Sequence, residues 1–312
     1  MRVLVTGSSG HLGDALTRTL RDLGHEVVPL DILEGSSITD RACVRQKIAG
    51  VQSVLHTATL HRPHVVTHDR QRFVDTNITG TLILLEEAVR AGVDSFVFTS
   101  STGVFQATGW VTEEVAPVPK NIYGVTKRAA EDLCELFSRR DRLPCIVLRT
   151  SRFFPEEDDD RSTREAYANE NLKVNEYLYR RVDIEDAVGA HLVAMARARD
   201  LGFGRYIISA TTPFSPTDIA DLHTNAPQVV RRYFPDYEAA YARRGWKMLS
   251  SIDRVYVNAK ARAELGWQPR YDFRLLLDRL EAGEDVTSPL ARLVGSKGYH
   301  AEVFTDGPYP VG

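Results

Sequence analysis

Short apolar runs alternate with stretches of helical periodicity over the first 150 residues. Five runs have the length and composition of buried strands, at residues 3–6, 26–30, 53–57, 96–99 and 145–148. Between the first two, leucines recur at helical spacing over residues 11–23, and Gly24 is a natural stop. This alternation predicts an α/β fold, a doubly wound parallel sheet with helices on both faces.

The pattern changes after residue 150. Residues 155–172 are charged and irregular, and a helix at 182–197 and a strand at 205–210 are expected to return to the sheet. From residue 211 onward prolines become frequent and the predicted elements are shorter and mixed. We therefore expect a sheet domain of residues 1–150 plus 182–210 and a smaller, mixed C-terminal lobe of residues 151–181 plus 211–312, with the main cleft between them.

A glycine-rich turn joins the first predicted strand to the first predicted helix. Glycines at every third position allow a tight turn, close approach of the backbone to a phosphate, and close packing of helix on strand. Amide groups at the helix start, aided by the helix dipole, favour a pyrophosphate there. The alternative is a plain structural turn. The predicted dinucleotide contacts in this turn are Gly7, Gly10, His11, Leu12 and Gly13.

An aspartate, Asp31, follows the second predicted strand. A carboxylate at this point can accept hydrogen bonds from both hydroxyls of an adenosine ribose, and it would repel a 2′-phosphate. No arginine follows at Ile32 or Leu33, so the sequence favours NAD over NADP. A solvated loop acid is the alternative interpretation of Asp31.

A serine, a tyrosine and a lysine follow in an order that suits redox chemistry. Ser101 lies just beyond the strand at 96–99, where ligands bind in open α/β sheets. Tyr123 and Lys127 are four residues apart at the start of a predicted helix, so they share one face. An ammonium and a positive nicotinamide ring are expected to lower the phenol pKa from about 10 toward neutrality. Without this context, the tyrosine and lysine would be read as a surface pair.

The order of these motifs resembles an extended short-chain dehydrogenase/reductase of the NAD-dependent epimerase/dehydratase family, similar to sugar-nucleotide 4-epimerases, from residue 1 to about 269. The resemblance implies a Rossmann domain that binds NAD, a substrate-binding lobe, and catalysis by Ser101, Tyr123 and Lys127. It also implies a homodimer formed through the apolar helices at 72–91 and 123–138, for which packing within one subunit is the alternative. The motifs that carry the resemblance are Thr6–Gly13, His56-Thr57-Ala58-Thr59, Asn77-x-x-Gly80-Thr81, Ser100-Ser101, Tyr123-x-x-x-Lys127 and Leu265-Gly266-Trp267-Gln268-Pro269.

The resemblance implies further cofactor contacts, and this chain departs from the family pattern at two places. Ser37 stands where relatives commonly carry an acid that contacts adenine, so that contact is expected to be weaker or made by backbone. Pro155 stands where 4-epimerases often carry an asparagine that helps to hold the substrate diphosphate, which weakens the case for a UDP-sugar. The additional predicted cofactor-binding residues are Ile32, Ser37, Ile38, Thr57, Ala58, Thr59, Asn77, Thr99 and Phe154.

Composition and charge exclude several classes of function. The net charge of −3 over 312 residues offers no electrostatic reason for a nucleic acid or an anionic membrane as partner. No apolar run approaches the roughly 18–20 residues that cross a bilayer, and Met1 leads directly into the first strand, which leaves no room for a secretion signal. The three cysteines have no metal-like spacing and are interpreted as reduced thiols, so we expect a cytoplasmic protein.

Several polar clusters have weaker interpretations. The acidic run at 156–160 is expected to be a solvated loop rather than a metal site. No metal is expected, because the histidine spacings match no tetrahedral pattern. For the histidine-rich segment after the third strand, a plain surface loop is the alternative to substrate contact. The candidate substrate contacts are His61, Arg62, His64, Thr102 and Arg254.

Three functions are compatible with the sequence. The leading hypothesis is an NAD-dependent sugar-modifying enzyme, an epimerase that oxidises a secondary alcohol to a transient ketone and returns the hydride to the other face. The alternative is an NAD-dependent dehydrogenase of a free sugar, a sugar acid or another small hydroxy compound. The third is a non-catalytic NAD-binding regulator, which would have no need of the serine, the tyrosine and the lysine. The expected substrate is a sugar or a sugar nucleotide.

Overall fold

The computed structural model of the protein describes residues 1–105, 107–158 and 160–298. Residues 299–312 of the predicted C-terminal lobe, Gln106 and Asp159 therefore lie outside the described residues. The main sheet has six strands in the order β2-β1-β3-β4-β6-β7, and every neighbouring pair is parallel. Its strands are β1 (Arg2–Thr6), β2 (Glu26–Leu30), β3 (Ser53–His56), β4 (Ser95–Ser101), β6 (Cys145–Thr150) and β7 (Phe203–Ile208).

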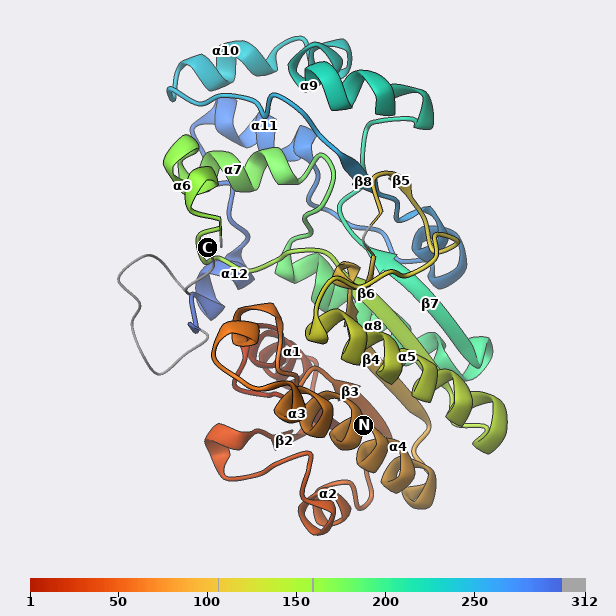
Figure 1. The fold of residues 1–312 in the computed structure, drawn as a ribbon. Coiled ribbons are helices and arrows are strands. Elements are labelled where there is room, and N and C mark those ends of the chain that lie inside the picture. Colours follow the sequence, from red (N-terminus) through yellow and green to blue (C-terminus); the bar gives the residue numbers. More distant parts are fainter. Residues whose placement is uncertain (106, 159, 299–312) are drawn as a thin grey trace.

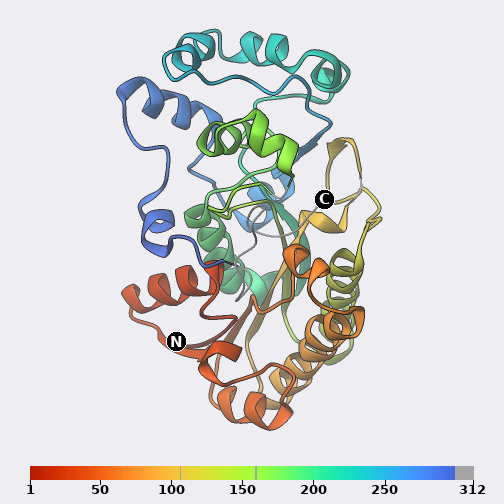
Figure 2. The same cartoon turned by 60° about the vertical axis from the view of Figure 1, so that its left-hand side comes forward.

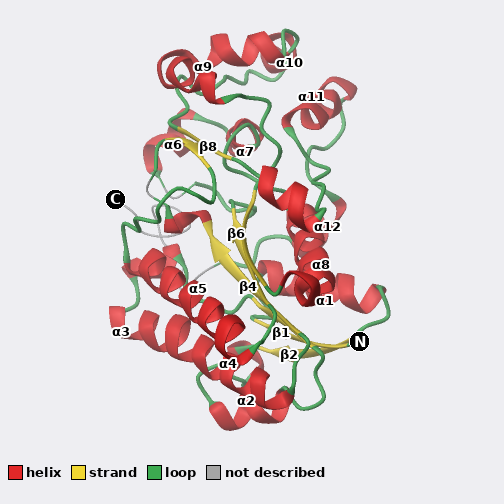
Figure 3. Ribbon diagram, turned by 90° about the vertical axis from the view of Figure 1, so that its right-hand side faces the viewer, coloured by secondary structure: helices red, strands yellow, loops and turns green. Residues whose placement is uncertain are grey.

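Helices cover both faces of this sheet, as Figure 3 shows. One face carries α1 (His11–Asp22), α8 (Ile184–Leu201) and α12 (Pro289–Val294), and the other carries α2 (Arg41–Lys47), α4 (Gly80–Ala91) and α5 (Ile122–Asp141). Successive residues of β1 point to opposite faces: Val3 and Val5 pack in one apolar cluster and Leu4 packs in the other. The predicted doubly wound α/β fold is confirmed.

The position of β1 inside the sheet creates the crevice in which the site lies. The chain places β2 on one side of β1 and β3 on the other, which makes the junction of β1 and β3 a topological switch point. Ligands of open α/β sheets bind outside the carboxyl ends of the strands at such a point. The glycine-rich turn follows β1 and Thr57 follows β3, so both predicted cofactor segments lie at this crevice.

A second apolar core lies away from the sheet, in the upper part of Figures 1 and 2. It is built from α7 (Asn169–Glu176), α9 (Ile219–Tyr233), α10 (Tyr237–Ala242) and α11 (Phe273–Ala282), with α6 (Arg161–Ala166) beside α7. A two-stranded parallel sheet joins β5 (Gly109–Val111) to β8 (Arg254–Tyr256). This pairing brings Arg254 next to the segment that follows Ser101. The residue boundaries of the two lobes remain a prediction.

Three predicted elements have other bounds in the structure. The predicted helix at 72–91 consists of α3 (Arg70–Phe73), a wide π-type turn (Val74–Thr79) and α4. The predicted helix at 182–197 runs from Ile184 to Leu201, because the Asp183 side chain accepts from the amide of Glu185 at its start. The predicted strand at 205–210 begins two residues earlier, at Phe203. Within the described residues, no helix combines the length and the hydropathy needed to span a membrane.

A buried ion pair ties helix α5 to the sheet. Arg149 of β6 donates to both carboxylate oxygens of Glu131 at distances of 2.7 to 3.2 Å, and both side chains are almost fully buried. Ser100 of β4 donates to the same carboxylate at 2.6 Å. The guanidinium also lies 4.7 Å from the ring centre of Phe105. Because a buried carboxylate must be compensated, this cluster holds α5, β4 and β6 together directly behind the cleft.

Replacement of Arg149 by methionine tests this interpretation. Arg149→Met removes the nearest counter-charge of the buried Glu131 carboxylate, which keeps the Ser100 hydroxyl at 2.6 Å and the Arg205 guanidinium at 3.4 Å. We therefore expect the free energy of unfolding to fall by about 3 kcal/mol. Chemical denaturation followed by circular dichroism measures the loss. Arg128→Met is the matched control, because Arg128 of the same helix pairs with Asp132 at the surface and its loss should cost about 1 kcal/mol or less. Equal effects of the two substitutions would contradict the assignment.

Candidate active site

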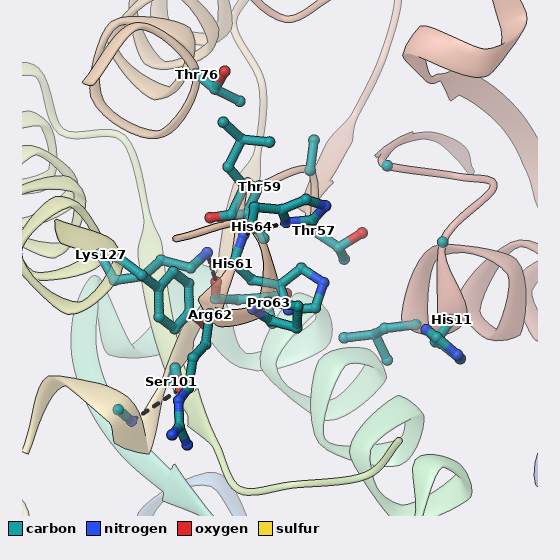
Figure 4. Close-up of a pocket in the computed structure, with 18 of the residues that line it drawn as sticks. His11, Thr57, Thr59, His61, Arg62, Pro63, His64, Thr76, Ser101 and Lys127 are labelled. Atoms are coloured by element: carbon teal, nitrogen blue, oxygen red, sulfur yellow. Dashed lines mark hydrogen bonds between the residues drawn. The ribbon is translucent and has the colours of Figure 1, made fainter. Parts of the chain in front are cut away.

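A single large cavity of about 1470 Å³ lies at the carboxyl edge of the sheet. It exceeds the ~300–1,000 Å³ of a site for one small ligand, so a dinucleotide and a second molecule fit together. Figure 4 shows Ser101, Lys127 and His61 close together, with His11 on the other side of the view. The cavity brings together the predicted residues Gly7, Gly10, His11, Leu12, Gly13, Asp31, Ile32, Ser37, Ile38, Thr57, Ala58, Thr59, His61, Arg62, His64, Thr99, Ser101, Thr102, Tyr123, Lys127, Phe154 and Arg254.

Two glycines of the glycine-rich turn stand where there is no space for a side chain. Gly7 has a φ of +67°, and a Cβ atom there would lie 2.8 Å from the backbone of Ala58. A Cβ at Gly13 would lie 1.9 Å from the carbonyl oxygen of Gly7. Helix α1 therefore packs directly onto the turn, with Gly10 at its N-cap position and no capping side chain from that residue. This is the arrangement that helix starts use to bind a pyrophosphate.

Asp31 lies beside the glycine-rich turn, and two backbone amides fix its carboxylate. One carboxylate oxygen accepts from the amide of Ser9 and the other from the amide of Leu33, both at 2.9 Å. Each carboxylate oxygen can accept more than one hydrogen bond, so Asp31 retains capacity for the two hydroxyls of a ribose. The Ser37 hydroxyl forms a hydrogen bond with that of Thr39 at 2.8 Å, so a neutral residue lines the cavity where relatives commonly carry an acid. The turn and Asp31 together fit a dinucleotide without a 2′-phosphate.

Asn77 is the one predicted cofactor contact that does not line the cavity. Its side-chain oxygen accepts from the amide of Leu60 at 2.8 Å and from the hydroxyl of Thr59 at 3.0 Å. Its side-chain nitrogen donates to the carbonyl of Leu60 and to the hydroxyl of Thr126. All of its hydrogen-bonding groups are thus used behind the wall. Asn77 thus positions the loop after β3 against α5, and its direct contact with the cofactor stays a prediction.

Ser101 and Tyr123 approach each other across Gly103. A Cβ atom at Gly103 would lie 3.1 Å from the Ser101 hydroxyl and 3.5 Å from a ring carbon of Tyr123. The Ser101 hydroxyl accepts from the amide of Gly103 at 2.9 Å, which fixes its position at the end of β4. Tyr123 lies in the first turn of α5, where the Asn121 side chain caps the helix by accepting from the amide of Gly124. The two hydroxyl groups therefore come from different elements and share one part of the cavity.

Burial governs the charge states of Tyr123 and Lys127. It raises the pKa of Tyr123 to about 12, although a hydrogen bond with Ser101 acts in the opposite direction. Burial lowers the pKa of Lys127 to about 7. The Lys127 side chain donates to the carbonyl of Thr99 at 2.6 Å and lies 4.6 Å from the ring centre of Phe98. In the protein without cofactor, burial outweighs the effect of Ser101, and Lys127 is not among the groups that shift the phenol pKa. The expected lowering by the ammonium together with a bound nicotinamide ring stays a prediction.

His61 and Phe154 form an aromatic wall beside Tyr123. Their rings stack at 5.6 Å with an angle of 22° between the planes, and the His61 ring lies 6.4 Å from that of Tyr123. Burial lowers the pKa of His61 well below its usual value of 6.5, so the ring is neutral at physiological pH. The part of the chain that the structure describes contains no group of three side chains suited to hold a metal ion.

The acidic run after Pro155 is only partly solvated, since Glu157 and Asp160 are exposed. The side chain of Glu156 is 7% exposed, and Asp158 is also buried and pairs with Arg152 at 2.6 Å. Although burial opposes its charge, hydrogen bonding and the charge of His11 hold the pKa of Glu156 at about 2. Sequence reasoning missed this burial, because the partners of Glu156 come from distant segments.

Glu156 also anchors the end of the described chain at the cavity. One carboxylate oxygen accepts from the Ser296 hydroxyl at 2.6 Å and from the amide of Lys297 at 3.2 Å. The Lys297 ammonium lies 2.8 Å from the carboxylate of Asp14 in α1. Residues 297 and 298 therefore line the cavity near the glycine-rich turn. Periodicity and motif spacing carry no signal for this contact.

Comparisons with known proteins agree with this geometry. Residues 3–208 match the sequence model of the NAD dependent epimerase/dehydratase family. The UDP-glucose 4-epimerase of Erwinia amylovora is 30% identical over 176 residues, which cover 48% of this chain and 52% of that protein. The match thus spans about half the length of that relative.

Solved structures share the fold over most of the chain. The UDP-N-acetylglucosamine 4-epimerase of Bacillus cereus has a TM-score of 0.64 at 18% identity, with 90% of this chain and 98% of that chain covered. The UDP-glucuronic acid 4-epimerase of Bacillus cereus in complex with NAD has a TM-score of 0.61 at 21% identity, with 90% and 94% covered. The expectation of NAD as cofactor is confirmed by the family, and the UDP-glucuronic acid 4-epimerase structure contains NAD.

Replacement of Gly13 by alanine tests the cofactor turn. Gly13→Ala places a methyl group against the carbonyl of Gly7, so we expect NAD affinity to fall about tenfold or more, in line with overpacking costs of ~1–3 kcal/mol. Titration calorimetry with NAD measures the effect. Gly189→Ala is the control, because the nearest atom to its Cβ lies at 3.8 Å. This helical substitution should leave NAD affinity unchanged and stabilise the fold by about 0.5–1 kcal/mol. Unchanged NAD binding in Gly13→Ala would exclude the turn as the site.

The lowered pKa of Lys127 predicts a pH dependence of stability. The folded protein binds fewer protons at this residue than the unfolded chain does between pH 7 and 10.5. Its contribution to the free energy of unfolding therefore rises with pH through that window, and the penalty is complete below pH 7. Lys127→Met should flatten this rise in denaturation curves of the cofactor-free protein, whereas Lys120→Met, at an exposed lysine of the same cavity, should retain it. An equal rise in both variants would contradict the assignment.

Proposed function

The chain belongs to the NAD dependent epimerase/dehydratase family, and we propose that it is an epimerase of a sugar-type substrate. In this proposal a secondary alcohol is oxidised to a ketone, which is then reduced from its other face within the same cavity. The observation that carries the proposal is the convergence of Ser101, Tyr123 and Lys127 with the glycine-rich turn in one cavity. A protein that only binds NAD has no need of this arrangement of proton-transfer groups.

Each of the three residues has a distinct role in this proposal. Ser101, fixed by the amide of Gly103, holds the substrate oxygen. Tyr123 exchanges a proton with that oxygen as the carbonyl forms and is reduced again. Lys127, with a pKa of about 7, takes up and releases a proton at neutral pH close to the phenol. NAD supplies the hydride acceptor when it is bound.

Two observations bear on the net reaction. Residues 297 and 298 line the cavity beside the start of α1, and this cover favours retention of the cofactor, which an epimerase needs between its two half-reactions. Pro155 favours a dehydrogenase of a small hydroxy compound as the second candidate. It has no amide hydrogen to donate to a diphosphate, and its carbonyl accepts from Lys173.

We also propose that two copies associate through α4 and α5. Both helices carry apolar side chains that stay exposed in the single chain, namely Val89, Val125 and Leu136. Exposed apolar groups on adjacent helices suit a helix-to-helix contact with a second copy. We expect light scattering to measure the mass of a dimer in solution.

Replacement of Tyr123 by phenylalanine tests the proposed chemistry. We expect the wild-type protein to purify with bound NAD and to convert a substrate to its epimer without net accumulation of NADH. Tyr123→Phe should lower turnover by roughly 10²–10⁴-fold and leave NAD bound. Tyr233→Phe, in α9 and outside the cavity, is the control. Accumulation of NADH with the alcohol would establish the dehydrogenase instead, and full activity in Tyr123→Phe would refute the proposed mechanism.

A further inference from the structure

The cavity is strongly basic although the chain as a whole has a net charge of −3. Among the described residues, eight lysine or arginine side chains line it, against two carboxylates, those of Asp31 and Asp75. The NAD pyrophosphate at the glycine-rich turn accounts for cations at that end. It does not account for Arg152, Arg180 and Arg254, which line the cavity from the C-terminal lobe. These cations indicate a second anionic group in the ligand of this site.

Arg180 and Arg254 are brought together by backbone pairing. The amide of Tyr256 donates to the carbonyl of Tyr179 at 2.9 Å, so the segment that carries Arg180 runs beside β8, which carries Arg254. The carboxylate of Asp253 is close to both cations, since a hydrogen bond from Arg254 and the charge of Arg180 both lower its pKa. The two guanidinium groups therefore occupy one region of the cavity wall.

Buried carboxylates hold Arg180 from behind, whereas Arg254 pairs with the partly exposed carboxylate of Asp253. Glu176, which is 1% exposed, lies within 2.8 Å of a nitrogen of Arg180, within 2.8 Å of one of Arg181 and within 3.2 Å of one of Arg152. Asp158 is the second carboxylate of the cluster. Glu176 and Asp158 thus fix the guanidinium groups of Arg152, Arg180 and Arg181. An arginine fixed in this way presents donors that are already oriented for a planar oxyanion.

A few residues of the cavity wall connect Ser101 with Arg254. From Ser101 the wall continues through Phe105 to Tyr256, whose rings lie 6.4 Å apart, and Arg254 is two residues from Tyr256. Residues 211–252, all of them described, contribute no side chain to the cavity. Residues 211–252 of the C-terminal lobe therefore offer no continuation of the cavity in which a nucleoside would lie.

We propose that Arg180 and Arg254 form an anion subsite that selects a small substrate with its own carboxylate or phosphate, a sugar acid or a sugar phosphate, over neutral sugars and over sugar nucleotides. The inference rests on the proposed function, because it names the substrate class of the same site. Carboxylate and phosphate share the oxyanion that a guanidinium recognises. The subsite places this group at the end of the cavity opposite the glycine-rich turn.

Binding to the NAD-loaded protein tests the subsite without any need for turnover. The probes are galacturonate, galactose 1-phosphate, galactose and UDP-galactose, each titrated by calorimetry. We expect one of the two small anions to bind at least about tenfold more tightly than galactose, since hydrogen bonds to charged groups contribute ~1.5–3 kcal/mol. The comparison of galacturonate with galactose 1-phosphate distinguishes the sugar acid from the sugar phosphate. Added salt should weaken binding of the anion and leave that of galactose unchanged.

Substitutions assign the effect to the two arginines. Arg180→Gln and Arg254→Gln should each reduce affinity for the preferred anion about tenfold and leave that for galactose unchanged. Unchanged galactose binding also shows that the variants are folded. Arg180→Lys retains the charge but cannot form the bidentate hydrogen bonds of a guanidinium, so it should give an intermediate affinity. Arg231→Gln is the control, because Arg231 pairs with Glu238 at the surface, outside the cavity, and it should behave as wild type.

Several outcomes would overturn the proposal. They are equal affinity for anions and galactose, tightest binding of UDP-galactose, no binding of any probe, or unchanged anion affinity in both glutamine variants. Failure of the proposed function is distinguishable from these results. Anion-selective binding without any conversion of the bound probe, in a protein that retains NAD, would preserve the subsite and refute the epimerase.

Discussion

The site depends on one constraint, the common direction of the six sheet strands. Because all run parallel, the segments that follow them meet at a single edge. At the switch point the backbones after β1 and β3 approach so closely that a Cβ at Gly7 would lie 2.8 Å from Ala58. Ser101 is the last residue of β4, and Arg152 follows β6 on the same side. Residues about 150 positions apart in sequence thus line one cavity without long loops to carry them.

Helix α5 is placed against this edge by buried charge as well as by apolar packing. The Glu131–Arg149 pair, with Ser100 as a third member, fixes the helix from behind. Lys127 is buried and Tyr123 is half-buried on the same helix, and burial sets the pKa of the lysine to about 7 and that of the tyrosine to about 12. Position and proton affinity therefore have a common cause. A more exposed helix would leave both groups near their ordinary pKa values.

The far end of the cavity is formed by contacts between the lobes. β5 pairs with β8, and the Tyr179–Tyr256 hydrogen bond adds the segment that carries Arg180. Glu156 joins helix α1 to residues 296–298 through His11. These contacts place Arg180 and Arg254 on one part of the cavity wall and residues 297 and 298 on another. The sheet edge carries the motifs that the family shares, while the rest of the wall depends on side chains from several distant segments.

The sequence by itself determined the parallel sheet, the glycine-rich turn and the convergence of Ser101, Tyr123 and Lys127, because periodicity and turn chemistry are local properties and parallel strands end at one edge. Only the tertiary structure showed that Asn77 faces away from the cavity, that Glu156 is buried, and that Arg180 lies beside Arg254. It also showed that burial raises the pKa of Tyr123, whereas the sequence predicted a lowering by an ammonium and a nicotinamide ring. Each of these depends on burial and on contacts between residues far apart in the chain. A local pattern contains no information on which distant side chain removes water from a given group.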